Sequence, residues 1–193
     1  ARGVLWHESS LKRVRSCGRH SILSDGSVQV RARDGVAGFA GLATCGSVWV
    51  CPVCNARVQA VRRLEVETAV AVTQGEGGSA AFGAYTLRHH AGSKLDPLWR
   101  SLSKCWQGVA RDKGVRQTRQ RLGQIGLIRA AEVTYGESGP HPHLHPLPLF
   151  EGQVTEADIA ELHAVEFRAW VAAAHRLGLS APVLAGQDLH LVK

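Results

Sequence analysis

Histidine alternates with other residues between positions 141 and 145, and this pattern constrains the fold more than any other feature of the chain. The segment reads His141-Pro142-His143-Leu144-His145. Because successive side chains of a β-strand point to opposite faces, the histidines are predicted to share one face of a sheet. Leu144 would then point to the opposite face and into the core. The pattern therefore predicts a strand that buries one side and presents a row of imidazoles on the other.

Two imidazoles that are two residues apart on a strand lie about 6.5–7 Å apart along it, so both can bind one divalent ion. A further ligand must come from a neighbouring strand. If residues 126–134 pair antiparallel with residues 141–150, Glu132 is the natural candidate, and His141 is the alternative. Imidazole and carboxylate ligands together suit Mn²⁺, Mg²⁺ or a late transition metal. A surface strand with incidental histidines is the other interpretation of the same pattern.

Two prolines, Pro146 and Pro148, follow the histidines. Each removes a donor from the hydrogen-bond ladder, which is awkward for a strand that carries metal ligands at the centre of a sheet. We therefore expect this strand either to pair on one side only beyond His145 or to bulge there.

Four of the five cysteines have the spacing of a structural zinc site. Cys51 and Cys54 form a CxxC motif at the head of a predicted helix, and Cys45 and Cys17 precede it. The tight CxxC turn brings two sulfurs to one ion, and a Cys₄ set favours Zn²⁺. The helix N-terminus favours the thiolate form. Zinc would tether a basic N-terminal arm that has too few apolar residues to fold alone. A redox CxxC pair and inert buried thiols are the alternatives.

Composition and charge narrow the class of protein. The chain has 193 residues, a net charge of +7 and a hydrophobic content of 45%, which is sufficient for a core and excludes a wholly disordered chain. Its apolar runs are far shorter than the roughly 18 residues of a membrane span. Without a leader-like start, the cytoplasm is the expected location. The positive charge favours a polyanionic partner. Because the sequence starts at Ala1 and contains no methionine, we expect this chain to be a fragment of a longer product.

The order of predicted elements indicates an α+β fold, in which an antiparallel β-sheet has helices packed on it. An N-terminal zinc-stabilised, β-rich subdomain is expected over residues 1–55, and a larger domain over residues 56–193. Cys105 shares an apolar helical stripe with Leu98 and Leu102, so it is predicted to be a core residue. The predicted helices cover residues 52–73, 96–110 and 155–178, and the predicted strands cover 28–32, 39–43, 47–51, 80–89, 126–134, 141–150 and 188–192.

Basic side chains in two segments are candidates for contacts with DNA phosphates, and a solvated surface is the alternative. One segment is the N-terminal arm, and the other follows the helix predicted at 96–110. The candidates are Arg13, Arg15, Arg111, Lys113, Arg116, Arg119 and Arg121.

Three stretches resemble, in motif and spacing, the actinobacterial rolling-circle plasmid replication initiators, which are HUH endonucleases. They are residues 45–54, residues 85–90, and Glu132-Val-Thr-Tyr followed by the histidine segment. The resemblance covers nearly the whole chain. It implies an HUH endonuclease-like sheet on which His143, His145 and Glu132 bind the catalytic Mn²⁺ or Mg²⁺. It also implies metal-dependent nicking and joining of one strand of plasmid origin DNA, single-stranded or hairpin, with a host helicase and a polymerase as further partners.

In the family that the chain resembles, a tyrosine on a downstream helix attacks the scissile phosphate and forms a phosphotyrosine link. This chain has two tyrosines, Tyr85 and Tyr135, and neither follows residue 155. The resemblance therefore implies that the nucleophile lies beyond Lys193. A zinc-stabilised DNA-binding module without chemistry is the main alternative function. A zinc-dependent hydrolase with Glu132 as its base is a third, although no HExxH spacing supports it.

Overall fold

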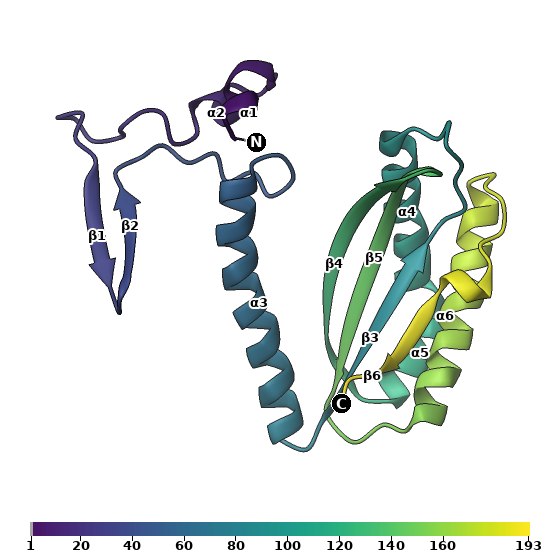
Figure 1. Cartoon of the computed structure of the whole chain (residues 1–193). Helices are drawn as coiled ribbons and strands as arrows, with labels where there is room; N and C mark the ends of the chain where they lie inside the picture. Colours follow the sequence, from purple (N-terminus) through teal and green to yellow (C-terminus); the bar gives the residue numbers. More distant parts are fainter. Residues whose placement is uncertain (1) are drawn as a thin grey trace. The chain divides into compact units, whose positions relative to one another are not determined.

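The computed structural model describes residues 2–193 and divides into two compact units, Ala1–Glu67 and Thr68–Lys193 (Figure 1). The boundary falls inside the long helix α3 (Pro52–Gly75), twelve residues after the subdomain limit that the sequence suggested at residue 55. Across residues 2–193, every helix is too short or too polar to cross a bilayer. Each unit is described by itself below.

The first unit has a small core made largely of cysteine. Two short helices, α1 (Arg2–Glu8) and α2 (Lys12–Ser16), precede a hairpin of β1 (Gln29–Arg33) and β2 (Val36–Ala40). The hydrophobic cluster of this unit consists of Val14 and four buried cysteines, with Leu5 packed against them. The predicted β-run at residues 47–51 is instead a turn at residues 48–50.

The hairpin turns at Asp34-Gly35, where both residues have positive φ angles of 51° and 75°. An Asp-Gly pair with these angles matches the two-residue turn that suits the twist of antiparallel strands. The turn sets the register that pairs Val30 with Phe39. The hairpin is therefore fixed by local turn chemistry rather than by burial, since both side chains are 71% exposed.

The second unit confirms the α+β class. Its four strands form an antiparallel sheet in the order β4-β5-β3-β6, and helices α4, α5 and α6 cover one face of it (Figure 1). A single 3₁₀ turn, Leu184–Gly186, precedes the last strand. The elements of this unit are β3 (Ser79–Thr86), α4 (Leu95–Arg111), α5 (Lys113–Arg121), β4 (Gln124–Gly136), β5 (Gly139–Phe150), α6 (Glu156–Arg176) and β6 (Asp188–Leu191).

The helical layer is positioned by one apolar stripe and two caps. The stripe of α4 is buried as predicted, and it includes Cys105, which is fully buried. The side chain of Asp112 accepts a hydrogen bond from the backbone N–H of Val115 and caps the start of α5. This helix was not predicted from the sequence. Thr155 and Asp158 form the capping box that starts α6.

Strand β5 is central, and its prolines interrupt pairing on one side only. Against β4 the ladder is unbroken from Gly126 to Gly136, with Pro146 opposite Arg129 and Pro148 opposite Leu127. Against β3 the paired positions stop at Leu144 and resume at Leu149. The expectation of one-sided pairing beyond His145 is therefore confirmed, because a proline without an N–H is tolerated where the ladder is open.

Candidate metal centres and nucleic-acid interface

The histidines of β5 lie on the sheet face opposite the helices. Pro142, Leu144 and Pro146 between and beside them are buried, whereas the imidazoles are half-buried. Residues that are directly opposite in an antiparallel pair share a face. His143 is paired with Glu132 of β4 on one side and with Thr86 of β3 on the other. The carboxylate and the histidines are thus presented on the same side of the sheet.

Hydrogen bonds determine which ring nitrogens of the histidines are free to act as ligands. Nδ1 of His145 donates to the carbonyl of Gly83 at 3.2 Å, in the stretch where the β3–β5 ladder is interrupted. Nε2, the other ring nitrogen of His145, lies 3.4 Å from Oε2 of Glu132. Nε2 of His141 lies 2.7 Å from the hydroxyl oxygen of Thr86.

His143 carries the clearest unsatisfied group of the site. Its Nδ1 is buried and has no hydrogen-bond partner among residues 2–193. Burial of a polar atom without a partner costs roughly 1–3 kcal/mol, and an orphaned imidazole nitrogen is the kind of atom that a metal ion satisfies. This nitrogen of His143 is therefore available to a divalent cation at this face.

Burial and the neighbouring imidazoles lower the pKa of both His141 and His143 below the usual value for histidine. Glu132 opposes this effect at His143 but does not reverse it. Both rings are therefore neutral near pH 7, which is the form that binds a metal.

The ligand atoms of His143, His145 and Glu132 do not all lie within 4.8 Å of one another. Among the described residues, one set of three or more candidate ligands meets that spacing, and it is the cysteine set. The side chain of Glu132 is 59% exposed, whereas that of His145 is 20% exposed. The structure thus places the three residues on one face without closing them into a metal site.

Aromatic rings that were not predicted from the sequence extend the histidine row in both directions. His89 stacks on His141 with 4.3 Å between ring centroids. At the other end, Phe82 stacks on His145 at 5.3 Å, and His190 lies 5.9 Å from Phe82. Strand alternation in β3 and β6 could have placed Phe82 and His190 on this face, but their register against β5 could not be read from the sequence.

The four predicted zinc ligands of the first unit are brought together. The Sγ atoms of Cys17, Cys45, Cys51 and Cys54 all lie within 4.8 Å of one another, and the closest pairs are 3.6 Å apart. Zn–S bonds of about 2.3 Å at tetrahedral angles place sulfurs roughly 3.8 Å apart. All four thiols are buried and none is in a disulfide. The cluster is consistent with a structural Zn²⁺.

The thiols of this cluster differ in acidity. Burial raises the pKa of Cys17 to about 12. At Cys54 burial acts in the same direction, but the Gly46 N–H and the neighbouring thiols outweigh it and lower the pKa to about 7. Without a cation, Cys54 therefore loses its proton more readily than Cys17, whereas zinc ligation would deprotonate all four thiols.

The basic candidates fall into two groups. Arg119 is 12% exposed, and its guanidinium binds Glu166 at 2.7 Å. Arg121 reaches Glu161 at 2.7 Å and Asp158 at 3.9 Å. The remaining candidates are exposed, and within residues 2–193 they form no ion pair; they are Arg13, Arg15, Arg111, Lys113 and Arg116.

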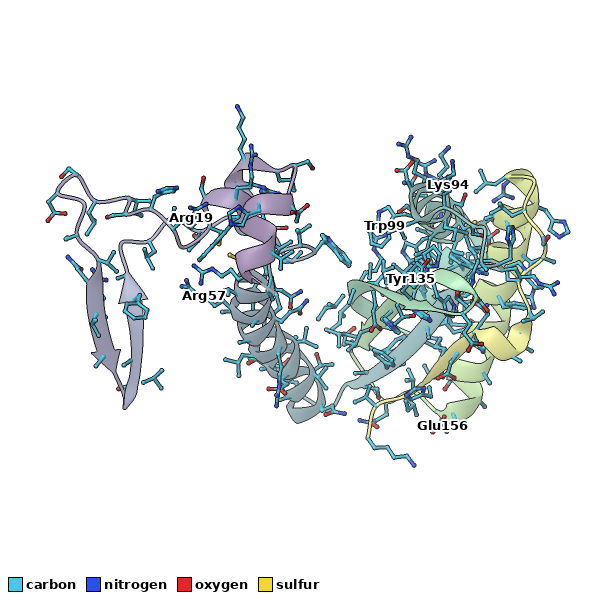
Figure 2. All side chains as sticks on the ribbon, turned by 45° about the horizontal axis from the view of Figure 1, so that its top comes forward. Arg19, Arg57, Lys94, Trp99, Tyr135 and Glu156 are labelled. Carbon is cyan, nitrogen blue, oxygen red and sulfur yellow. The ribbon has the colours of Figure 1, made fainter. Side chains whose placement is uncertain are left out.

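Neither tyrosine has the setting of a nucleophile on a helix beside the histidines. Tyr85 points into the helical layer, where its hydroxyl donates to Glu166 at 2.6 Å. Burial and the adjacent carboxylate raise its pKa far above the usual value. Tyr135 is 81% exposed near the end of the β4–β5 hairpin (Figure 2). It borders a hollow that His89 and His141 also line.

These features define an α+β protein with a histidine-bearing antiparallel sheet and a four-cysteine cluster. Two curated Streptomyces proteins are similar to it in sequence. The neomycin resistance protein of Streptomyces cyanogenus is 33% identical over 153 residues, which is 66% of this chain and 35% of that protein. Protein rep of Streptomyces lividans is 30% identical over 157 residues, which is 67% of this chain and 34% of that protein. The chain thus spans about a third of the length of the curated relatives it matches.

No protein-family model matches the sequence. Among solved structures, a hydantoinase/carbamoylase family amidase from Burkholderia ambifaria aligns with 61% of this chain and 28% of its own, at 8% identity and a TM-score of 0.32. A structural similarity at this level supports no conclusion about fold or function. The similarity to the two Streptomyces proteins is the comparison that bears on function.

Proposed function

We propose that the chain is the metal-binding and DNA-binding part of a plasmid rolling-circle replication initiator that nicks and rejoins one strand of origin DNA through a phosphotyrosine intermediate. The observation that carries the proposal is the histidine row on the open face of the sheet, with Glu132 paired opposite His143. The similarity to Protein rep supports it. We place the reaction in the cytoplasm, with a host helicase and a polymerase acting after the nick.

In this proposal His143, His145 and Glu132 hold a divalent cation, Mn²⁺ or Mg²⁺. Such an ion would neutralise charge on the scissile phosphate and orient it for in-line attack. His145 presents Nε2 because its Nδ1 is engaged by Gly83. Thr86 holds the ring of His141 at the end of the row, which favours His141 as a positioning residue rather than the third ligand.

The nucleophile in this proposal is a tyrosine beyond Lys193, carried by a helix that reaches the open face of the sheet. Attack requires a nucleophile in line with the phosphate and held rigidly beside the metal. Tyr85 faces the wrong side of the sheet, and Tyr135 stands on an exposed hairpin end.

We also propose that the four-cysteine cluster binds structural Zn²⁺ and that residues 1–55 form the zinc-binding part of the chain. The exposed, unpaired cations Arg13, Arg15, Arg111, Lys113 and Arg116 are proposed to contact DNA phosphates. The guanidinium of Arg119 pairs with buried Glu166, and that of Arg121 reaches Glu161 and Asp158. We therefore leave both arginines out of this surface.

The experiment that tests the metal centre is calorimetric titration of the zinc-loaded chain with Mn²⁺. One Mn²⁺ equivalent is expected, and the double variant His143→Ala/His145→Ala should lose it. The matched control is His20→Ala/His175→Ala, which removes two exposed histidines elsewhere and should bind Mn²⁺ as the parent does. Unchanged Mn²⁺ affinity in the first variant would favour a DNA-binding module without chemistry.

A further inference from the structure

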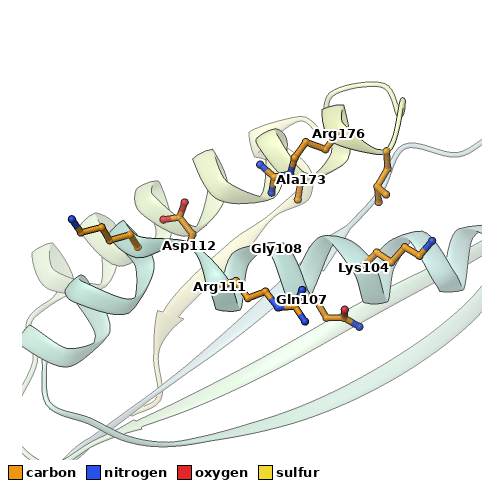
Figure 3. A pocket seen from close by; sticks show the side chains of 9 residues that line it. Lys104, Gln107, Gly108, Arg111, Asp112, Ala173 and Arg176 are labelled. Carbon is orange, nitrogen blue, oxygen red and sulfur yellow. The ribbon is translucent and has the colours of Figure 1, made fainter.

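A hollow of about 570 Å³ lies in the helical layer of the second unit, away from the histidine row (Figure 3). It is bounded by the C-terminal half of α4, the start of α5 and the C-terminal end of α6. Its lining residues are Lys104, Gln107, Gly108, Arg111, Asp112, Lys113, Ala173, Arg176 and Leu177.

The hollow is built by the close packing of α4 against α6 at Gly108. A Cβ atom at Gly108 would lie 2.7 Å from the Cβ of Ala173 and 3.1 Å from Nη2 of Arg176. The missing side chain therefore lets α6 approach and lets the Arg176 guanidinium lie over the backbone of α4. Lys104, Gly108 and Arg111 stand at i, i+4 and i+7, so their positions share one face of α4.

The charge of this hollow is not compensated. Four basic side chains line it, and none of them forms an ion pair within residues 2–193. Its single carboxylate, Asp112, accepts the backbone hydrogen bond of Val115 at 3.0 Å as the cap of α5. Elsewhere on the same helices, Arg100, Arg119 and Arg121 are all paired with acidic groups. Cations gathered without partners around a concave surface indicate an anionic ligand.

The chemistry of the lining selects phosphate among anions. Two guanidinium groups offer forked donors that match phosphate oxygens, and two ammonium groups add charge. The lining contains no aromatic ring on which a base could stack. This composition suits a backbone phosphate of DNA better than a free nucleotide.

We propose that this hollow binds a backbone phosphate of a second DNA segment, separate from the strand at the histidine row. The sheet lies between the two sites, so one short single strand does not occupy both (Figure 1). The duplex arm of a hairpin is the segment that fits. The inference rests on the proposed function, because that function identifies the polyanion as DNA. It adds Lys104 and Arg176 to the residues proposed to contact DNA phosphates.

The test is fluorescence anisotropy of the 193-residue chain with a labelled hairpin carrying a single-stranded tail. The variant Lys104→Ala/Arg111→Ala/Arg176→Ala should bind the hairpin at least about tenfold more weakly. The slope of log affinity against log salt should fall by about 2 to 3, the value expected for three lost phosphate contacts. Affinity for the single-stranded tail alone should change much less.

The matched control is Arg62→Ala/Arg63→Ala/Arg100→Ala, which removes the same charge from exposed, paired arginines. Equal losses of hairpin affinity in both triple variants would show an effect of net charge alone and would contradict the proposed phosphate site. A thermal melt checks folding, and Arg111→Glu alone provides a second test, since it should also weaken hairpin binding selectively. Retained hairpin affinity in a folded Arg111→Glu protein would count against the site.

A titration with inorganic phosphate separates the two sources of phosphate. If phosphate binds the parent chain and is lost in the pocket variant while hairpin affinity is unchanged, the hollow takes a small phosphate and the proposal for DNA fails. Mn²⁺ binding should be the same in the Lys104→Ala/Arg111→Ala/Arg176→Ala variant and the parent. Failure of the proposed phosphate site is therefore distinguishable from failure of the metal centre, which the His143→Ala/His145→Ala variant tests.

Discussion

The hydroxyl of Tyr85 donates a 2.6 Å hydrogen bond to Glu166, and this bond points the side chain into the helical layer. Glu166 also accepts two hydrogen bonds from Arg119, so strand β3 and helices α5 and α6 meet at one buried carboxylate. Trp106 and Trp170 pack edge-on against the Tyr85 ring. Tyr85 is therefore a structural residue of the core.

Tyr85 should not ionise in the native protein. Burial, followed by the Glu166 charge, raises its pKa, so the folded state binds its proton more tightly than the unfolded state does. This contribution to stability is complete below pH 10 and is lost as pH rises above it. Near pH 10, the phenolate absorbance at about 295 nm should therefore be lower in native protein than in denaturant, because Tyr85 stays protonated in the native state. Two native phenolates near pH 10 would contradict the buried assignment.

Glu166 should be among the most sensitive polar positions of the second unit. Glu166→Ala leaves the Arg119 guanidinium, which is 12% exposed, without its partner, and removes the acceptor of Tyr85. Loss of one member of a buried pair costs about 3–5 kcal/mol. The control is Glu161→Ala on the same helix, whose pair with Arg121 is about half exposed and is worth roughly 1 kcal/mol or less. Urea denaturation measures both, and similar losses would contradict the network.

Zinc content should distinguish the clustered cysteines from the isolated one. Cys51→Ser removes one of four converging thiols, so the chain should lose its zinc equivalent and the order of its first unit. Cys105→Ser changes a core residue of the second unit and should retain zinc. Metal analysis by mass spectrometry and far-UV circular dichroism provide the readouts. A full zinc equivalent in the Cys51 variant would show that the cluster does not bind zinc as proposed.

The parts of the fold that could be predicted from the sequence are those with a strong period. The alternation in β5 and the stripe of α4 were predicted because burial on one face imposes a spacing of two or of about 3.6 residues. Helix α5 was missed because it buries only Val115 and Thr118 and depends on the Asp112 cap. Helices α1 and α2 have no apolar period, and α2 buries only Val14 beside the cysteine cluster.

The candidate sites also differ in whether local sequence or a tertiary contact brings their residues together. Ligands that are close in sequence, such as Cys51 and Cys54, could be grouped from spacing alone. The hollow that joins Lys104 to Arg176 depends on how α4 packs against α6 at Gly108, a tertiary contact that no local pattern encodes. The pairing of Arg119 with Glu166 is likewise a contact between helices, and it removes from the surface a cation that the sequence suggested for DNA.

The measurement that tests the central claim most directly is a gel assay for a covalent protein–DNA adduct on a labelled single-stranded origin oligonucleotide with Mn²⁺. The full-length gene product should form the adduct, and His143→Ala should abolish it while sparing most duplex binding, because phosphate contacts supply that affinity. Residues 1–193 alone should form none. An adduct formed by residues 1–193 and lost in Tyr135→Phe or Tyr85→Phe would contradict the account.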